Sequence, residues 1–279
     1  MTASTTRLAI NGVAGRMGRA VRAVAVERED VTVVLGITPT REDNGRQATD
    51  AAGSETMAVV SPSNRRDALQ RHEIDVVVDF SAPDGVAGLA ADCAVEDVAL
   101  ISGTTGLDGE TKAALREASE TVPVIHATNF SRGIYALVDA LEAALGALPG
   151  YDIEVLETHH RGKQDAPSGT AKTILETIGE HRDFETVHGR EGIQPRTEDE
   201  VGMLVRRAGG VRGEHEVLLA GNDEVLMLTH RAEDRGVFAS GAVDAAVWLA
   251  GRDADWYTLD SAFQSGLRVD GKTDGQRET

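Results

Sequence analysis

The chain has 279 residues, of which 41% are hydrophobic and 4% aromatic, enough for one large or two medium globular domains. Its 46 Asp and Glu against 28 Lys and Arg give a formal net charge of -18, which disfavours binding to nucleic acid or to an anionic membrane surface. Cys93 is the single cysteine, so an intramolecular disulfide and a cysteine-based zinc site are excluded.

Short apolar runs alternate with helical stretches through the first 130 residues. Strands are expected at 7–11, 31–37, 57–61, 74–80, 98–102 and 122–126, and helices at 17–25, 65–71, 85–96 and 109–119. The runs 76–78 and 99–101 are apolar without alternation, as expected for strands that are buried on both faces. This order predicts an α/β fold with a Rossmann-type, doubly wound parallel sheet.

The pattern changes after Asn129. Helices are expected at 133–148, 168–180 and 238–250, and strands at 151–158, 201–208, 214–220 and 224–230. They predict a second, α+β domain on a mixed, open and largely antiparallel sheet. Because the last helix is expected to pack back on the first domain, the predicted domains are 1–130 with 239–279, and 131–238.

The N-terminal segment lacks the apolar core of a signal peptide, and no apolar run reaches the length of a membrane span. We therefore expect a cytoplasmic protein without a membrane partner. Four lysines, Lys112, Lys163, Lys172 and Lys272, accompany the large acidic excess. Such a composition resembles that of proteins from a high-salt cytoplasm, where dissolved ions screen the repulsion between acidic side chains.

A glycine-rich turn follows the first expected strand and opens a helix. It comprises Gly12, Val13, Ala14, Gly15, Arg16, Met17 and Gly18. Glycines at this place let the backbone approach a pyrophosphate that rests on the helix N-terminus, which indicates a dinucleotide site. The ribose is usually recognised after the second strand, where Thr40 and Arg41 stand and would suit the 2′-phosphate of NADPH. Glu42 or Asp43 could instead bind the 2′-hydroxyl of NADH.

Two further turns follow expected strands, at the sheet edge where ligands gather. They contain Gly103, Thr104 and Thr105 in one case and Ala127, Thr128, Asn129 and Phe130 in the other. We expect both to contact the nicotinamide end of the cofactor, although either could be an ordinary turn.

The most informative stretch runs from 157 to 172. It holds His159, His160 and Lys163, followed by Ser168, Gly169 and Thr170 at the start of a helix. An ammonium and free N–H groups at a helix start bind carboxylates, and a histidine beside them can transfer a proton. The alternative is a polar strand end that only caps the second domain.

Three other histidines, His188, His215 and His230, match no metal-binding spacing, so no metal is predicted. Arg206 and Arg207 precede a glycine-rich turn at 209–213. We interpret this segment either as a loop over the substrate or as a solvated charge cluster.

Seven segments, taken together, resemble the 4-hydroxy-tetrahydrodipicolinate reductase (dihydrodipicolinate reductase) family. They are GVAGRMG (12–18), VVVDFSAP (76–83), SGTTG (102–106), ATNFSRG (127–133), ETHHRGKQDAPSGTA (157–171), RRAGGVRGEH (206–215) and FASGA (238–242). The resemblance implies NADPH or NADH as cofactor, a small cyclic imine dicarboxylate as substrate and a homotetramer. It also implies His159 and Lys163 as catalytic residues, with His160, Ser168, Gly169 and Thr170 binding substrate.

One departure from the family bears on the cofactor. Its members often carry Glu-Arg after the second strand, whereas Thr40 stands here in place of the acid, so that NADPH is favoured. Two alternative functions remain open: another two-domain amino-acid dehydrogenase, and a nucleotide-sensing protein without turnover.

Overall fold

The computed structural model describes residues 5–39, 47–49 and 56–264. Contacts divide the chain into two compact units, Met1–Ala127 with Ala242–Thr279, and Thr128–Gly241. The boundaries expected from the sequence lie three residues from these, and the binding roles given to the two parts stay predictions. Within the described ranges, no helix is both long and apolar enough to cross a membrane.

The first unit is built on an eight-stranded sheet of order β13-β7-β6-β5-β1-β2-β4-β3. Every neighbouring pair is parallel except β3 with β4. Its strands are β1 (Thr6–Asn11), β2 (Val31–Ile37), β3 (Gln47–Thr49), β4 (Thr56–Val60), β5 (Val76–Asp79), β6 (Ala99–Ser102), β7 (Val124–His126) and β13 (Trp256–Tyr257). Its helices include α1 (Arg16–Val26), α2 (Arg65–Arg71), α3 (Val86–Val95), α4 (Gly109–Ala118) and α8 (Leu259–Gln264). The predicted Rossmann-type sheet is confirmed.

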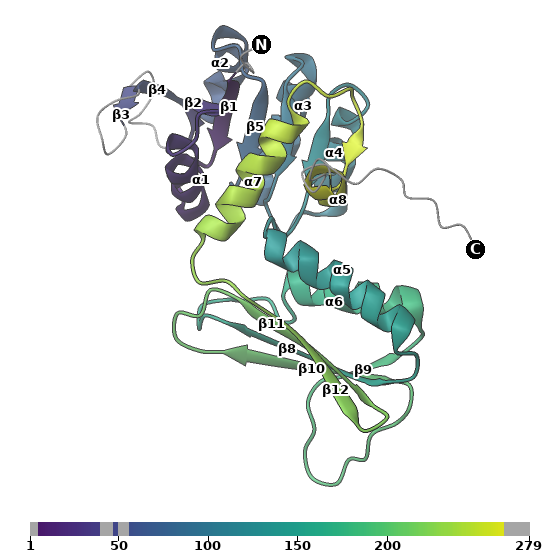
Figure 1. Ribbon diagram of the computed structural model, residues 1–279. Helices are drawn as coiled ribbons and strands as arrows, with labels where there is room; N and C mark the ends of the chain where they lie inside the picture. The colour runs from purple at the N-terminus through teal and green to yellow at the C-terminus, as the bar shows by residue number, and fades with distance from the viewer. Residues whose placement is uncertain (1–4, 40–46, 50–55, 265–279) are drawn as a thin grey trace, which may run out of the picture. The chain divides into compact units, whose positions relative to one another are not determined.

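Helices cover both faces of this sheet (Figure 1). On one face, α2, α3 and α4 share a continuous core with Val77 and Leu100, and Cys93 is buried in it. The alternation of side chains along β5 directs Val76 and Val78 to the opposite face, where α1 packs against β1 and β2. Burial on both faces explains why these strands are apolar without alternation.

The second unit is built on a five-stranded sheet of order β12-β11-β8-β10-β9. Its strands are β8 (Asp152–His159), β9 (Glu185–Val187), β10 (Glu200–Arg207), β11 (Glu214–Gly221) and β12 (Glu224–Arg231). Helices α5 (Arg132–Ala147) and α6 (Gly169–His181) pack on one face, and α7 (Gly236–Leu249) spans the boundary with the first unit.

The mixed character predicted for this sheet is confirmed, but the expectation that it is largely antiparallel is wrong. β10 runs parallel to both β8 and β9, whereas β11 is antiparallel to β8 and β12. Two crossovers account for this: α6 connects β8 to β9, and residues 188–199 connect β9 to β10, so that the chain re-enters the sheet each time in the direction of the strand it left.

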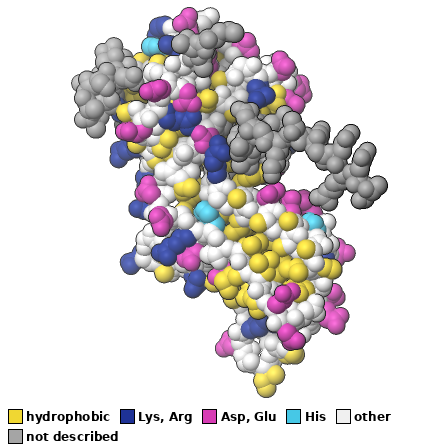
Figure 2. Space-filling model, viewed as in Figure 1, with side chains coloured by type: hydrophobic (Ala, Val, Ile, Leu, Met, Phe, Trp, Pro, Cys, Tyr) yellow, Lys and Arg dark blue, Asp and Glu magenta, His cyan; other side chains and the backbone are white. Residues whose placement is uncertain are grey.

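The face of the mixed sheet opposite α5 and α6 carries exposed apolar side chains. Leu204, Val225 and Met227 are 42%, 62% and 51% exposed. Figure 2 shows hydrophobic side chains gathered over this unit. Exposed apolar side chains on one face of a sheet can mark an interaction site.

Candidate active site

The end of β8 places a carboxylate and an imidazole where the strand would otherwise continue its apolar face. Ile153 and Val155 point into the core beneath α5 and α6, and Glu157 and His159 continue the same alternation. Glu157 is completely buried and His159 is 9% exposed. Because burial of unpaired polar groups is costly, both side chains need partners.

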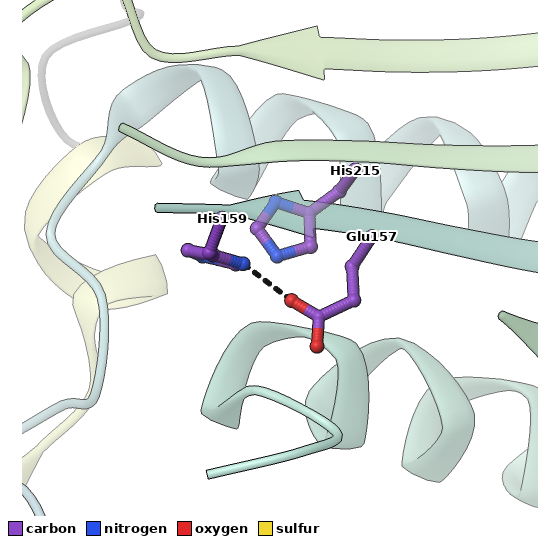
Figure 3. Close-up of side chains that lie close together, drawn as sticks. All are labelled: Glu157, His159 and His215. Atoms are coloured by element: carbon purple, nitrogen blue, oxygen red, sulfur yellow. Dashed lines mark ion pairs between the residues drawn. The ribbon is translucent and has the colours of Figure 1, made fainter. Parts of the chain in front are cut away.

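Glu157 has partners for both carboxylate oxygens. Its Oε2 forms an ion pair with His159 Nδ1 (Figure 3). Its Oε1 accepts hydrogen bonds from the Ser168 N–H and from Arg207 Nη2, each at 3.0 Å. Burial opposes ionisation of this carboxyl, but His159, Arg207 and the Ser168 N–H outweigh it and lower the pKa of Glu157 to about 2. Glu157 is therefore ionised at neutral pH.

A second histidine lies beside this pair. His215 on β11 is opposite Glu157 in the antiparallel ladder. Its ring lies 5.2 Å from that of His159, edge-on at 74°, and its Nε2 is 3.2 Å from Ser168 Oγ. Burial, aided by the charge of His159, lowers the pKa of His215 to about 4, so that it is neutral at physiological pH.

The start of α6 faces the same cluster. Ser168 caps the helix, because its Oγ accepts from the Ala171 N–H at 3.2 Å. The N–H groups of Gly169 and Thr170 lie in the first turn, where a helix offers no internal acceptor. Thr170 Oγ1 accepts from Asn129 Nδ2 at 2.9 Å. This end of α6 can therefore receive an anion.

Lys163 lies in the turn between β8 and α6. Its Nζ is 2.8 Å from Asp165 Oδ1, and its N–H donates to the His160 carbonyl at 3.1 Å. Burial tends to raise the pKa of Asp165, but the Lys163 ammonium outweighs it and holds that pKa below its ordinary value. His160 follows the last residue of β8 and is half-buried.

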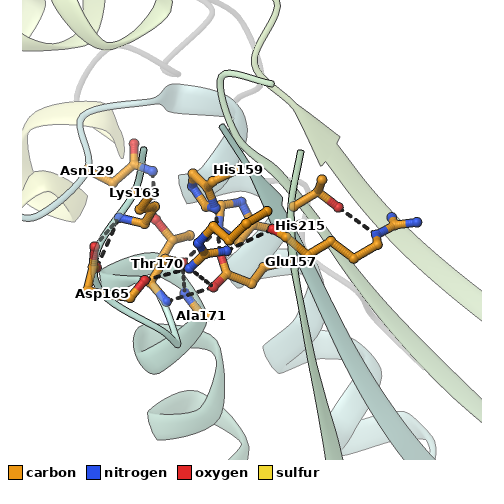
Figure 4. A network of polar contacts seen from close by, with 12 residues as sticks. Asn129, Glu157, His159, Lys163, Asp165, Thr170, Ala171 and His215 are labelled. Atoms are coloured by element: carbon orange, nitrogen blue, oxygen red, sulfur yellow. Dashed lines mark hydrogen bonds and ion pairs between the residues drawn. The ribbon is translucent and has the colours of Figure 1, made fainter. Parts of the chain in front are cut away.

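The structure thus brings His159, Lys163 and the start of α6 into one network (Figure 4). Sequence reasoning missed Glu157, Asp165 and His215 as members. Of the two arginines, Arg207 is half-buried and reaches Glu157 and the Asp165 carbonyl, whereas Arg206 is exposed and its Nε donates to Thr158 Oγ1 at 2.9 Å. Both interpretations of this segment stay predictions.

Glu157, His159 and His215 also place one potential metal-ligand atom each within 4.8 Å of one another. The donor set does not suit a cation, however. Both oxygens of Glu157 already have partners: Oε1 accepts from the Ser168 N–H, and Oε2 forms an ion pair with His159. The guanidinium of Arg207 also lies 3.0 Å from Oε1. A metal would have to displace these donors and sit beside a positive charge. That the protein needs no metal stays a prediction.

In the first unit, the glycine-rich turn connects β1 to α1. Gly12 has a φ of +82°, and a Cβ there would lie 2.5 Å from the Phe80 carbonyl oxygen. Gly15 precedes α1, and Ala14, Gly15 and Arg16 are exposed, whereas Val13 is buried. Met17 lies in the first turn of α1. Exposed backbone at a helix start fits the pyrophosphate of a dinucleotide.

A buried carboxylate joins the loops at this end of the sheet. Asp79 accepts from Asn11 Nδ2 at 2.8 Å, Ser81 Oγ at 2.6 Å, Ser102 Oγ at 2.9 Å and Thr104 Oγ1 at 2.8 Å. Of the turn predicted to contact the cofactor, Thr104 is therefore turned inward, Gly103 packs against the Phe80 ring and Thr105 is exposed.

The remaining predicted cofactor residues lie at the boundary between the two units or outside the described residues. Ala127 follows β7 in the first unit, whereas Thr128, Asn129 and Phe130 belong to the second, where Phe130 is buried. Thr40 and Arg41, predicted to recognise the ribose, lie outside the described residues.

Two family models together cover nearly the whole chain: "Dihydrodipicolinate reductase, N-terminus" matches residues 6–130 and "Dihydrodipicolinate reductase, C-terminus" matches residues 133–263. The chain belongs to the dihydrodipicolinate reductase family. The N-terminal part of this family is a nucleotide-binding Rossmann domain, which supports NAD(P)H as the cofactor.

Individual relatives of the chain belong to the same family. The chain is 51% identical over 252 residues to the 4-hydroxy-tetrahydrodipicolinate reductase of Haloarcula marismortui, covering 90% of this chain and 96% of the relative. It is 38% identical over 262 residues to that of Alkalilimnicola ehrlichii, covering 91% and 97%. The fold matches that of a dipicolinate-bound dihydrodipicolinate reductase from Paenisporosarcina sp. TG-14, with a TM-score of 0.73, 22% identity and coverage of 91% of this chain and 97% of the other.

Proposed function

We propose that this protein is an NAD(P)H-dependent 4-hydroxy-tetrahydrodipicolinate reductase that produces tetrahydrodipicolinate for lysine biosynthesis through diaminopimelate. The observation that carries the proposal is the buried Glu157–His159 pair beside the start of α6, in a chain of this family. It combines a proton-transferring imidazole with N–H groups that can bind a carboxylate.

In the proposed reaction, the cyclic imine first loses its 4-hydroxyl group as water and becomes a conjugated dihydropyridine. When bound, NAD(P)H supplies a hydride to C4 of this ring. The N–H groups of Gly169 and Thr170, with Ser168, His160 and Lys163, hold the two carboxylates and orient the ring. His159 or Lys163 then protonates the carbon next to C4, and general acid help of this kind contributes ~10²–10⁴-fold.

For the cofactor, we assign Gly12, Val13, Ala14, Gly15, Arg16 and Met17 to the pyrophosphate. Gly103, Thr104, Thr105 and the segment from Ala127 to Phe130 are assigned to the nicotinamide end. The close approach of Gly12 to Phe80 and the exposed start of α1 fit this assignment. NADPH is favoured over NADH, because Arg41 can pair with a 2′-phosphate while Thr40 stands where an acid often occurs.

We also propose a cytoplasmic homotetramer in which the open face of the mixed sheet contacts another copy of the chain. The exposed Leu204, Val225 and Met227 support this use of the face. Light scattering on the purified protein measures the mass of the assembly. Met227→Lys places a charge on this face and should reduce that mass.

A coupled assay tests the activity. The substrate is generated in place by its synthase, and the absorbance of NADPH and NADH is followed separately in high salt. We expect oxidation that depends on the imine and is faster with NADPH. His159→Gln should mainly lower kcat, and Lys163→Ala should lower kcat and raise KM. His72→Gln, a histidine substitution in the first unit, is the matched control.

The alternatives give different results in the same assay. Folded protein that oxidises neither cofactor with the imine would contradict the proposal and favour another amino-acid dehydrogenase or a sensor without turnover. Full activity of both the His159 and Lys163 variants would contradict the assigned residues.

A further inference from the structure

The carboxylate of Glu157, which is completely buried, contacts His159 at Nδ1. We propose that Glu157 is a positioning residue: it accepts a hydrogen bond from the N–H at His159 Nδ1 and so leaves Nε2 as the ring nitrogen that exchanges a proton with the substrate. The inference rests on the proposed function, in which His159 is a proton donor. Glu157 itself does not touch the reacting atoms.

The first support is the set of contacts that keep Glu157 ionised and fixed. Its Oε1 accepts from the Ser168 N–H and from Arg207 Nη2, both at 3.0 Å, while Oε2 faces His159 Nδ1. These donors come from three parts of the unit: the start of α6, β10 and β8 itself. An ionised carboxylate can only accept, so the nitrogen that faces it must carry a hydrogen.

The second support is the space on the other side of the imidazole. A Cβ on Gly213 would lie 3.2 Å from His159 Nε2, which is closer than most Cβ contacts. The absence of a side chain at Gly213 therefore leaves room beside the nitrogen that the inference assigns to proton exchange. Nδ1 is buried against Glu157, and the two ring nitrogens consequently have different surroundings.

The remaining charged and titratable groups around the pair are compatible with this arrangement. His215 on β11 is neutral and stacks edge-on against His159, and Ser168 Oγ connects it to α6. Arg207 from β10 pairs with Glu157, and Lys163 is held by Asp165 in the turn after β8. Glu157 is therefore the carboxylate paired with His159.

The proton balance follows directly. Protonated His159 carries hydrogens on both nitrogens. When the bond from Nε2 to its hydrogen breaks, a C–H bond forms on the substrate carbon, and the ring is left neutral with its hydrogen on Nδ1. Glu157 stays ionised throughout and faces the N–H at Nδ1 before and after the transfer.

Replacing Glu157 with Gln makes a sharp test, because Gln has a single acceptor oxygen. Two donors, the Ser168 N–H and Arg207, would face that oxygen, so the amide NH₂ group would turn toward His159 Nδ1. The imidazole would then have to accept at Nδ1 and carry its hydrogen on Nε2. The substitution should thus exchange the tautomer.

Solid-state ¹⁵N NMR of protein labelled on histidine reports the tautomer without requiring turnover, and His159→Gln identifies the His159 signals. We expect neutral His159 to be protonated on Nδ1 in the wild type and on Nε2 in Glu157→Gln. We expect kcat of that variant to fall at least ~10-fold, a part of the general acid effect, with KM changing less. Glu157→Asp, which keeps the carboxylate, should retain the wild-type tautomer.

Glu154→Gln is the matched control, because Glu154 lies on the same strand and pairs with Arg196 rather than with His159. Wild-type His159 protonated on Nε2 would overturn the inference, as would an unchanged tautomer in Glu157→Gln together with a loss of kcat no larger than in Glu154→Gln. If Glu157→Gln does not fold, the wild type and Glu157→Asp still decide the tautomer. Wild-type protein with the expected tautomer and no turnover would instead overturn the proposed function.

Discussion

Replacing Asp79 with Asn should loosen the loops that follow three neighbouring strands of the first unit. The side chain of Asp79 is completely buried and accepts hydrogen bonds from side chains at the ends of β1 and β6 and in the loops after β5 and β6. Because the proposed cofactor turns start from the same strand ends, Asp79 connects the stability of the unit to its ability to bind a dinucleotide.

The magnitude follows from the number of acceptors lost. The Asn oxygen can still serve Asn11 and Ser81, but the NH₂ group would face the hydroxyls of Ser102 and Thr104, and Thr104 Oγ1 already accepts from the Ser81 N–H at 3.0 Å. A net loss of one charge-assisted hydrogen bond lowers the free energy of unfolding by ~2 kcal/mol. Asp79→Ala leaves all these donors without an acceptor and should lower it by at least ~4 kcal/mol.

Denaturant unfolding in high salt measures the free energy of unfolding of Asp79→Asn and Asp79→Ala, and fluorescence titration measures their affinity for NADPH. Ser102→Ala, which removes a single hydrogen-bond donor to Asp79, is the comparison variant and should lower the free energy of unfolding by about 1 kcal/mol. Unchanged unfolding free energy and unchanged NADPH affinity in Asp79→Asn and Asp79→Ala would refute the reasoning.

Three further predictions concern pH, the loop beside His159 and salt. The pKa of Glu157 is lowered from 4.5 to about 2, so the stability it contributes is complete above pH ~4.5 and is lost as the pH falls toward 2. Denaturant titrations at several pH values should therefore show about 3 kcal/mol less acid destabilisation over this range in Glu157→Gln. Gly213→Ala places a methyl group 3.2 Å from His159 Nε2 and should lower kcat several-fold in the coupled assay while Tm changes little. A net charge of -18 implies that Tm rises with salt, and a Tm independent of salt would contradict this expectation.

Long elements could be predicted from the sequence because their apolar pattern is strong. β2 and α2 have the expected bounds, and most others differ by one or two residues at each end. The short strands β3, β9 and β13 were missed. Their two or three residues are too few to show a period, and they are strands only through pairing with a neighbour.

The candidate site was predicted where its residues are close in sequence. His159, Lys163 and Ser168 lie within ten positions of one another, whereas Arg207 and His215 reach the cluster only through strand pairing. Glu157 was missed for a different reason. Its spacing of two from His159 puts both on one face of a strand, but nothing in the sequence indicates that this face is buried at its end.

The first sheet takes its last strand from the far end of the chain. β13 pairs with β7, and the whole second unit lies between them in sequence. The whole second unit is therefore synthesised before Trp256 and Tyr257, and until then one edge of β7 has its N–H and C=O groups unpaired. Such an edge can recruit another strand, so a nascent chain can mispair with its neighbours until β13 covers β7.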